Sequence, residues 1–199
     1  MIVFKVIILL FSLVLHELAH GYMALFCGDK TAKYSGRLSL NPLKHLDPIG
    51  ALIPIFMLLS GSNFIIGWAK PVPVNYFAFK NGRVGEFLVS IAGVLTNYFL
   101  MILGAILIRY GVIPFNDLSV YFIIINMALG TFNLLPISPL DGSRVVASFL
   151  NDENRIKIFT LDTYGILFII ALSYFGVLSR VMSPIYNMLL GVVDLIIRS

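Results

Sequence analysis

Long apolar stretches alternate with short charged ones along the 199 residues of this chain. A helix needs about 20 residues to cross the hydrocarbon core of a bilayer, and four of the stretches reach that length. Two further stretches near the C-terminus are shorter. The pattern predicts an all-α polytopic membrane protein, a bundle of about 5–6 membrane segments. The expected segments are Val6–Gly28, Pro48–Ala69, Phe87–Ile108, Leu118–Leu140, Thr163–Ser179 and the short Val181–Val193.

Two of the charged loops contain short stretches typical of extended structure. These are Ser35–Leu40 and Val72–Asn75, which predict short β pieces, while Pro71 and Pro73 exclude regular helix from the second loop. No Pro/Ser-rich linker divides the chain. We therefore expect a single domain over residues 1–199, with a motif-bearing core at about 6–150 and accessory membrane segments at about 158–197.

Composition identifies lipid as the solvent. Hydrophobic residues make up 59% of the chain and charged residues 12%, against about 25% charged residues in a soluble domain. A folded chain of this size cannot hide so much apolar surface from water. This excludes an ordinary cytosolic domain, a disordered chain and a disulfide-stapled secreted scaffold. The net charge of +4 is typical of cytoplasmic loops and carries no sign of a nucleic-acid partner.

The 14 Lys and Arg residues also constrain the topology. If Pro48–Ala69 crosses the membrane fully, these residues divide 6 to 8 between the two faces. If the segment enters and returns, they divide 11 to 3, with Lys5, Arg109 and Arg180 on the minor side. The positive-inside rule favours the second division. We expect a multi-pass protein of the cell membrane with a re-entrant or non-crossing second segment, its N-terminus outside and its motif-bearing loops cytoplasmic.

The first apolar segment carries a metal-binding pattern, His16-Glu17-Leu18-Ala19-His20. Positions i and i+4 share one helix face, so both imidazoles reach one ion, and zinc accepts such nitrogens. Glu17 then lies beside the ion as a general base. In the alternative, His16 and His20 pack between helices and Glu17 bonds to a neighbouring helix. That alternative explains a carboxylate within the membrane but not the pair of imidazoles.

A catalytic zinc site usually has three protein ligands, and Asp141 is the best candidate for the third. It closes an uncharged run that Pro136 and Pro139 must break, so the chain can turn a carboxylate toward an ion there. Alternatively, Asp141-Gly142 forms a turn and caps the next helix. His45, the third histidine, is interpreted as an interfacial or capping group.

These motifs together resemble the site-2 proteases, the intramembrane zinc metalloproteases of peptidase family M50. The resemblance rests on the H-E-x-x-H helix, on Leu140-Asp141-Gly142 within a run that starts at Asn133, and on Ala92-Gly93-Val94-Leu95-Thr96-Asn97. The last of these departs from the family pattern at Val94, where proline is usual. Residues 36–45 and 67–75 resemble a compact prokaryotic subgroup without a PDZ domain.

The resemblance implies hydrolysis of peptide bonds in or near transmembrane segments of substrate proteins, as in regulated intramembrane proteolysis. One Zn²⁺ per chain would be held by His16, His20 and Asp141, with Glu17 as the base. Asn97 and Gly93 would contact the substrate, although the same pair also fits a small-residue helix contact with one interhelical hydrogen bond. We further expect Asn133 to support the ligands as a hydrogen-bond donor behind them. The partners expected are transmembrane substrates and the bilayer, and the oligomeric state stays open.

Two other functions compete with an endopeptidase. A membrane carrier for metal ions could use the same four residues, although such carriers tend to contain repeats and this sequence has none. A protease-like protein could also bind membrane helices without cutting them, although a pure binder has no need of Glu17.

Overall fold

A computed structural model describes residues 1–45, 47, 70–76 and 78–198, and these residues are helical or irregular. The helices are α1 (Ile2–Phe26), α2 (Thr31–Tyr34), η1 (Pro42–Lys44), α4 (Gly82–Arg109), α5 (Asp117–Asn133), α6 (Asp141–Ala147), α7 (Asp152–Thr160), α8 (Asp162–Tyr174) and α9 (Val177–Arg198).

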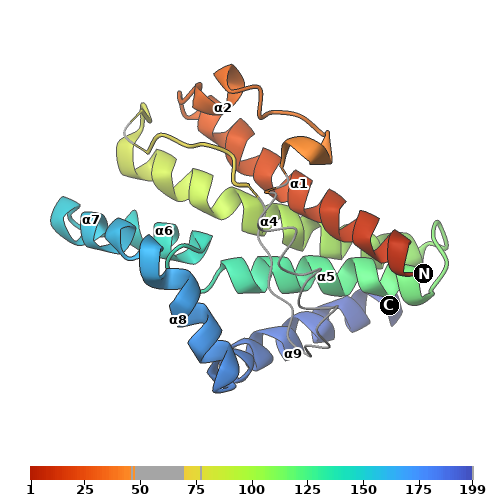
Figure 1. Cartoon of the computed structure of the whole chain (residues 1–199). Helices are drawn as coiled ribbons and strands as arrows, with labels where there is room; N and C mark the ends of the chain where they lie inside the picture. The colour runs from red at the N-terminus through yellow and green to blue at the C-terminus, as the bar shows by residue number, and fades with distance from the viewer. Residues whose placement is uncertain (46, 48–69, 77, 199) are drawn as a thin grey trace.

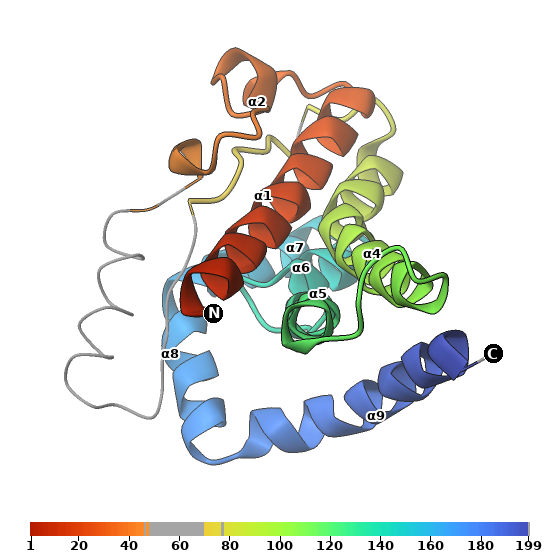
Figure 2. The same cartoon turned by 90° about the vertical axis from the view of Figure 1, so that its right-hand side faces the viewer.

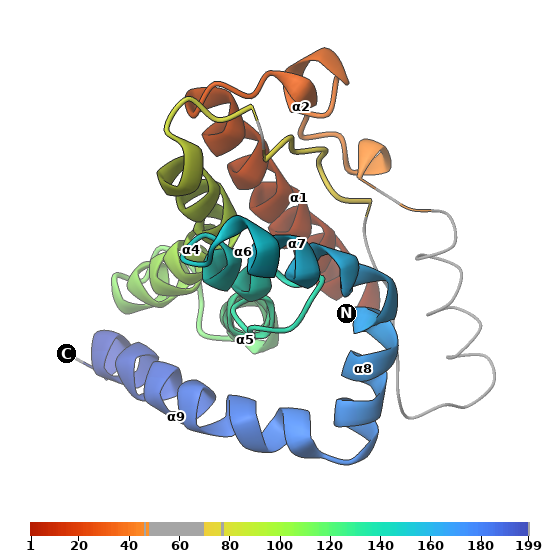
Figure 3. The same cartoon turned by 90° about the vertical axis from the view of Figure 1, so that its left-hand side faces the viewer.

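The long helix α4 is the centre of the bundle and contacts α1, α5, α6 and α9 (Figure 1). Seen along α5, helices α1 and α4 lie side by side on one flank of α5, and α9 runs past its other flank (Figure 2). The short helix α6 packs on α4, next to α7 (Figure 3). This arrangement brings α1, α4 and α6 together, and these three helices carry the sequence motifs.

Fewer helices qualify as membrane spans than the sequence predicts. Among the described residues, three helices, α1, α4 and α9, are long and apolar enough to cross a membrane. The pair α7 and α8 would add a fourth if it counts as one span, bent by 63°. The predicted 5–6 segments are therefore not confirmed. The all-helical, apolar architecture agrees with the prediction, and the chain is a membrane protein.

The predicted segment Leu118–Leu140 differs most from the structure, because its helix α5 has only 17 residues. The helix starts with a capping box, in which the Asn116 side chain accepts from the backbone of Leu118 and Ser119. It ends at Asn133, ahead of Pro136 and Pro139. Two prolines so close together cannot continue a helix, so the chain forms a loop and starts again as α6.

The predicted β pieces do not form, since no residue of 35–40 or 72–75 is in a strand. Pro71 and Pro73 have no N–H groups to pair. The N–H groups of Val72 and Asn75 donate instead to carboxylates, those of Glu17 and Asp29. The second piece is thus held by acidic side chains of α1 and of the turn that follows it, rather than by a strand ladder.

The predicted re-entrant segment Pro48–Ala69 lies outside the described residues. Its described flanks are adjacent, since the Lys70 N–H donates to the His45 carbonyl oxygen over 2.9 Å. The end of α1 and the approach to α4 are also joined, because Lys80 N–H donates to the Cys27 carbonyl oxygen over 2.9 Å.

Candidate metal centre

The two histidines of α1 lie one turn apart and face the interior. His16 and His20 are 5% and 8% exposed, and their Nε2 atoms are 3.1 Å apart. No helix breaker interrupts α1, so the i, i+4 spacing delivers both rings to one side, as expected. Glu17, next along the chain, is partly exposed beside them.

Asp141 reaches the same point from a position 121 residues further along the chain. Its Oδ2 lies 3.1 Å from Nε2 of His16 and 3.2 Å from Nε2 of His20. It is the first residue of α6, whose N-cap is Leu140. Its carboxylate therefore adds an oxygen donor to the two imidazole nitrogens.

The three donors fit a zinc ion. Ligand atoms of a tetrahedral site, each about 2.0–2.1 Å from the metal, lie about 3.3 Å apart. His16, His20 and Asp141 are the residues of the described chain whose donor atoms converge in this way, all within 4.8 Å of one another. The Nδ1 of His20 lies 2.7 Å from the Val89 carbonyl oxygen, which only accepts, so Nδ1 carries the proton and Nε2 presents its lone pair to the site.

Helix α4 closes one side of this centre with its backbone. A Cβ built on Gly93 would lie 2.6 Å from Cε1 and 2.7 Å from Nε2 of His16, and closer still to Nε2 of His20. Only glycine permits this approach. One turn later on α4, the fully buried Asn97 places its Oδ1 2.6 Å from Nδ1 of His16. Gly93 and Asn97 thus both lie against the imidazoles.

Glu17 has a main-chain partner. Its Oε2 accepts from the Val72 N–H over 2.7 Å, and a second carboxylate, Asp29, accepts from the Asn75 N–H over 2.7 Å. The segment from 72 to 75 therefore lies along α1 with one end tied to the residue that the motif assigns as base.

Comparison with known proteins identifies the group to which this geometry belongs. The model of peptidase family M50 matches residues 112–175, which include Asp141 but not the H-E-x-x-H helix. YwhC of Bacillus subtilis, named as a candidate zinc metalloprotease, is 39% identical over 195 residues, which cover 92% of this chain and 86% of YwhC. The chain belongs to peptidase family M50.

More distant relatives extend the similarity within M50. Rip2 of Mycolicibacterium smegmatis, also named as a candidate zinc metalloprotease, is 29% identical over 176 residues, 86% of this chain and 66% of Rip2. The zinc metalloprotease MJ0392 of Methanocaldococcus jannaschii is 28% identical over 149 residues, 74% of this chain and 34% of that protein. No solved structure matches this chain. The predicted family, the zinc cofactor and the peptidase function are confirmed.

Two other predicted residues of this M50 peptidase lie apart from the three donors. Asn133 donates through Nδ2 to the Leu129 carbonyl oxygen one turn back in α5, and among the described contacts no hydrogen bond joins it to the three donors. His45 is buried at the end of η1 and its Nε2 lies 2.8 Å from the Ser39 carbonyl oxygen. Since Ser39 lies outside η1, this side chain caps no group of that helix, and the interfacial or capping role of His45 stays a prediction.

Sequence reasoning missed the charged contacts that hold α6, α7 and α8 near the centre. Glu86, fully buried in α4, pairs with Nε of Arg155 in α7 over 2.9 Å. Asp162 in α8 accepts from both Ser138 and Arg144, which lie three residues before and three after Asp141. No local sequence pattern distinguishes these acids from the acids that stay exposed.

Proposed function

We propose that this chain hydrolyses peptide bonds in or near transmembrane segments of membrane proteins, with one Zn²⁺ held by His16, His20 and Asp141 and with Glu17 as general base. The observation that carries the proposal is the convergence of three donor atoms within 4.8 Å. Two come from one helix and the third from a helix that begins at the end of a proline-broken segment. The family membership of the chain supplies the reaction class.

The residues around the ion divide the remaining work. Bound zinc supplies a Lewis acid toward the scissile carbonyl and the attacking water. Glu17 holds Oε2 on the Val72 N–H, which leaves Oε1 to take a proton from water and later return it to the leaving amine. Val72 thereby orients the base through the main chain. Because a helical substrate has its carbonyls in hydrogen bonds, it must unwind locally before attack.

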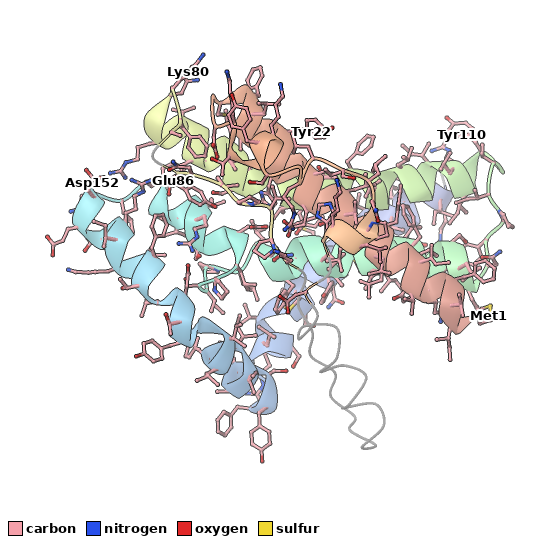
Figure 4. The ribbon with its side chains drawn as sticks, turned by 45° about the horizontal axis from the view of Figure 1, so that its top comes forward. Met1, Tyr22, Lys80, Glu86, Tyr110 and Asp152 are labelled. Carbon is pink, nitrogen blue, oxygen red and sulfur yellow. The ribbon has the colours of Figure 1, made fainter. Side chains whose placement is uncertain are left out.

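The proposal includes a multi-pass topology with an outside N-terminus and cytoplasmic motif loops. Figure 4 supports the opposite directions of α1 and α4 that this topology needs, because Met1 and Tyr110 lie at one end of the bundle and Lys80, Glu86 and Asp152 at the other. The bond between Lys70 and His45 places the described flanks of the predicted second segment next to each other. Cysteine accessibility in sealed vesicles at residues 40 and 78 tests the topology, and labelling from opposite faces would contradict it.

The catalytic assignment is tested with Glu17→Gln in the full chain. Glutamine keeps an oxygen for the Val72 N–H but cannot accept the proton, so zinc content stays at one per chain while cleavage of a transmembrane reporter falls by at least 10²-fold, the usual size of a general-base effect. Cleavage at the wild-type rate by the zinc-loaded variant would overturn the mechanism. Asp141→Ala is the companion variant, and full zinc stoichiometry in it would remove Asp141 from the ligand set.

The carrier alternative predicts a different result in the same preparation. Reconstituted wild-type protein would move zinc into sealed vesicles, and it would do so without cutting the reporter. We expect cleavage and no uptake. A protein that only binds helices would pull down the reporter intact in both the wild type and Glu17→Gln.

A further inference from the structure

A chain of buried polar side chains runs from α5 through α4 to the metal centre on α1. Nδ2 of Asn126 donates to the Phe122 carbonyl oxygen over 2.9 Å and to Oγ of Ser12 over 3.0 Å. Nδ2 of Asn97 donates to Oδ1 of Asn126 over 2.9 Å, and Oδ1 of Asn97 lies 2.6 Å from Nδ1 of His16. Ser12, Asn97 and Asn126 are all 0% exposed.

We propose that Asn126 is a positioning residue that fixes the tautomer of His16 through Asn97. The inference rests on the proposed zinc site, and it changes the role of Asn97. Both ends of the Asn97 amide are taken up between helices, so the side chain serves a metal ligand rather than the substrate.

One group in this series of hydrogen bonds can only accept, and it fixes which partner donates at every other step. A backbone carbonyl only accepts, so the Phe122 oxygen fixes the NH₂ end of Asn126 toward itself and turns Oδ1 toward Asn97. Asn97 must then donate through its own NH₂, which turns its Oδ1 toward His16. Nδ1 of His16 must therefore carry the proton, and Nε2 is left with a lone pair on the side of the metal.

The two histidine ligands are thus fixed in different ways. His20 donates directly to the Val89 carbonyl oxygen, one step from a main-chain acceptor. His16 depends on two side-chain amides, and each amide could reverse if its neighbour were removed. Without Asn126, the Asn97 amide can present NH₂ to His16, which then protonates on Nε2 and loses its donor to zinc. His16 is the ligand that a distant substitution can disable.

The test measures zinc affinity of the full-length, detergent-solubilised protein by chelator competition, with a melting temperature for each variant. Asn126→Leu keeps a side chain of similar size and removes the polarity. We expect zinc affinity to fall by about 10- to 100-fold, the usual effect of losing the hydrogen-bond partner behind a ligating histidine. The matched control is Thr131→Val, which removes another buried contact between the same two helices, the one from Thr131 to Tyr98 at 3.2 Å. Its zinc affinity should stay within about twofold of the wild type, since it does not touch the chain to His16.

Rescue separates a positioning role from a structural one. In Asn97→Asp both side-chain oxygens accept, so the carboxylate presents an acceptor to His16 in either orientation, whatever residue stands at position 126. The double variant Asn97→Asp with Asn126→Leu should therefore recover most of the zinc affinity lost in Asn126→Leu. If Asn126→Leu does not fold, Asn97→Leu is compared with Asn97→Asp in an Asn126→Ala background, where no buried amide oxygen faces the new carboxylate. Retained affinity in the aspartate and loss in the leucine variant support the inference.

Each outcome has one meaning. Wild-type protein without stoichiometric zinc refutes the proposed function itself. Wild-type protein with zinc, and an Asn126→Leu variant of equal affinity, refutes only the inference. If Asn97→Leu and Asn97→Asp have equal zinc affinity and both raise the KM for the reporter, Asn97 contacts the substrate and does not orient His16.

Discussion

Replacing Gly93 with alanine adds one methyl group at the most confined point of the metal centre. The new Cβ would lie 2.6 Å and 2.7 Å from two atoms of the His16 ring, whereas ordinary contacts begin near 3.4 Å. The ring edge or the helix must therefore shift by at least about 0.8 Å, and zinc ligand distances tolerate only about 0.2 Å. Neither ring can swing aside freely, since Nδ1 of His16 and of His20 are both engaged.

We expect zinc affinity to fall by about 100-fold or more in Gly93→Ala, which is about 2.7 kcal/mol of binding free energy. Chelator competition on the purified full chain measures it. The control is Gly85→Ala on the same helix, where the new Cβ meets the Phe79 side chain at 2.9 Å, well apart from the ligands in sequence. That control should cost about 1–3 kcal/mol of stability from overpacking and leave zinc affinity intact. A Gly93→Ala protein with wild-type zinc affinity would refute the close approach of α4.

Three further predictions concern the support of the centre. Arg155→Met leaves the Glu86 carboxylate buried and uncompensated, so the free energy of unfolding should drop by about 3–5 kcal/mol, and adding Glu86→Leu should restore most of it in chemical denaturation. Gly165→Ala would place a methyl group against the Ser138 carbonyl, in the loop that leads to the third ligand, so both the melting temperature and the zinc affinity should fall. In the control Gly191→Ala the new Cβ meets open space, so neither the melting temperature nor the zinc affinity should fall. Removing zinc with a chelator should lower the melting temperature, because free zinc at about 100 times its Kd contributes about 2.7 kcal/mol, and an unchanged melting temperature would argue against a site built into the fold.

The site positions that could be predicted from the sequence are those where ionisable residues interrupt or end an apolar membrane segment. His16, Glu17 and Asp141 lie in or at the end of apolar runs. They stand out because an ionisable group in lipid is costly unless it is paired, bound to a metal or facing a wet cavity. Helix periodicity then placed the two imidazoles on one face. The long helices α1 and α4 were predicted from uninterrupted apolar length. Helix α1 begins four residues before its predicted segment and ends two residues before it, whereas α4 begins five residues earlier and ends one residue later than predicted.

The features that the sequence did not reveal depend on tertiary contacts. Asn126 is one uncharged polar residue in an apolar run, and only the approach of α4 to α5 turns it into a partner of Asn97. A polar amide within a membrane helix is nevertheless a signal, and Ser12, one turn before His16, shares its face. The short extended pieces were predicted from loop composition, but the competition between a strand ladder and the carboxylates of Glu17 and Asp29 cannot be assessed without knowing where α1 lies.

The hydrogen bond from the Val72 N–H to Glu17 bears on how easily the enzyme could become resistant to an inhibitor by amino-acid substitution. A compound that captures this N–H in place of the carboxylate would recognise a group common to nineteen of the twenty amino acids, and only proline at position 72 would remove it. Substitutions at position 72 would therefore almost never remove this contact and so would rarely give resistance. Escape at the neighbouring Gly21 is also hindered, because a Cβ added there would lie 3.1 Å from the Val72 side chain.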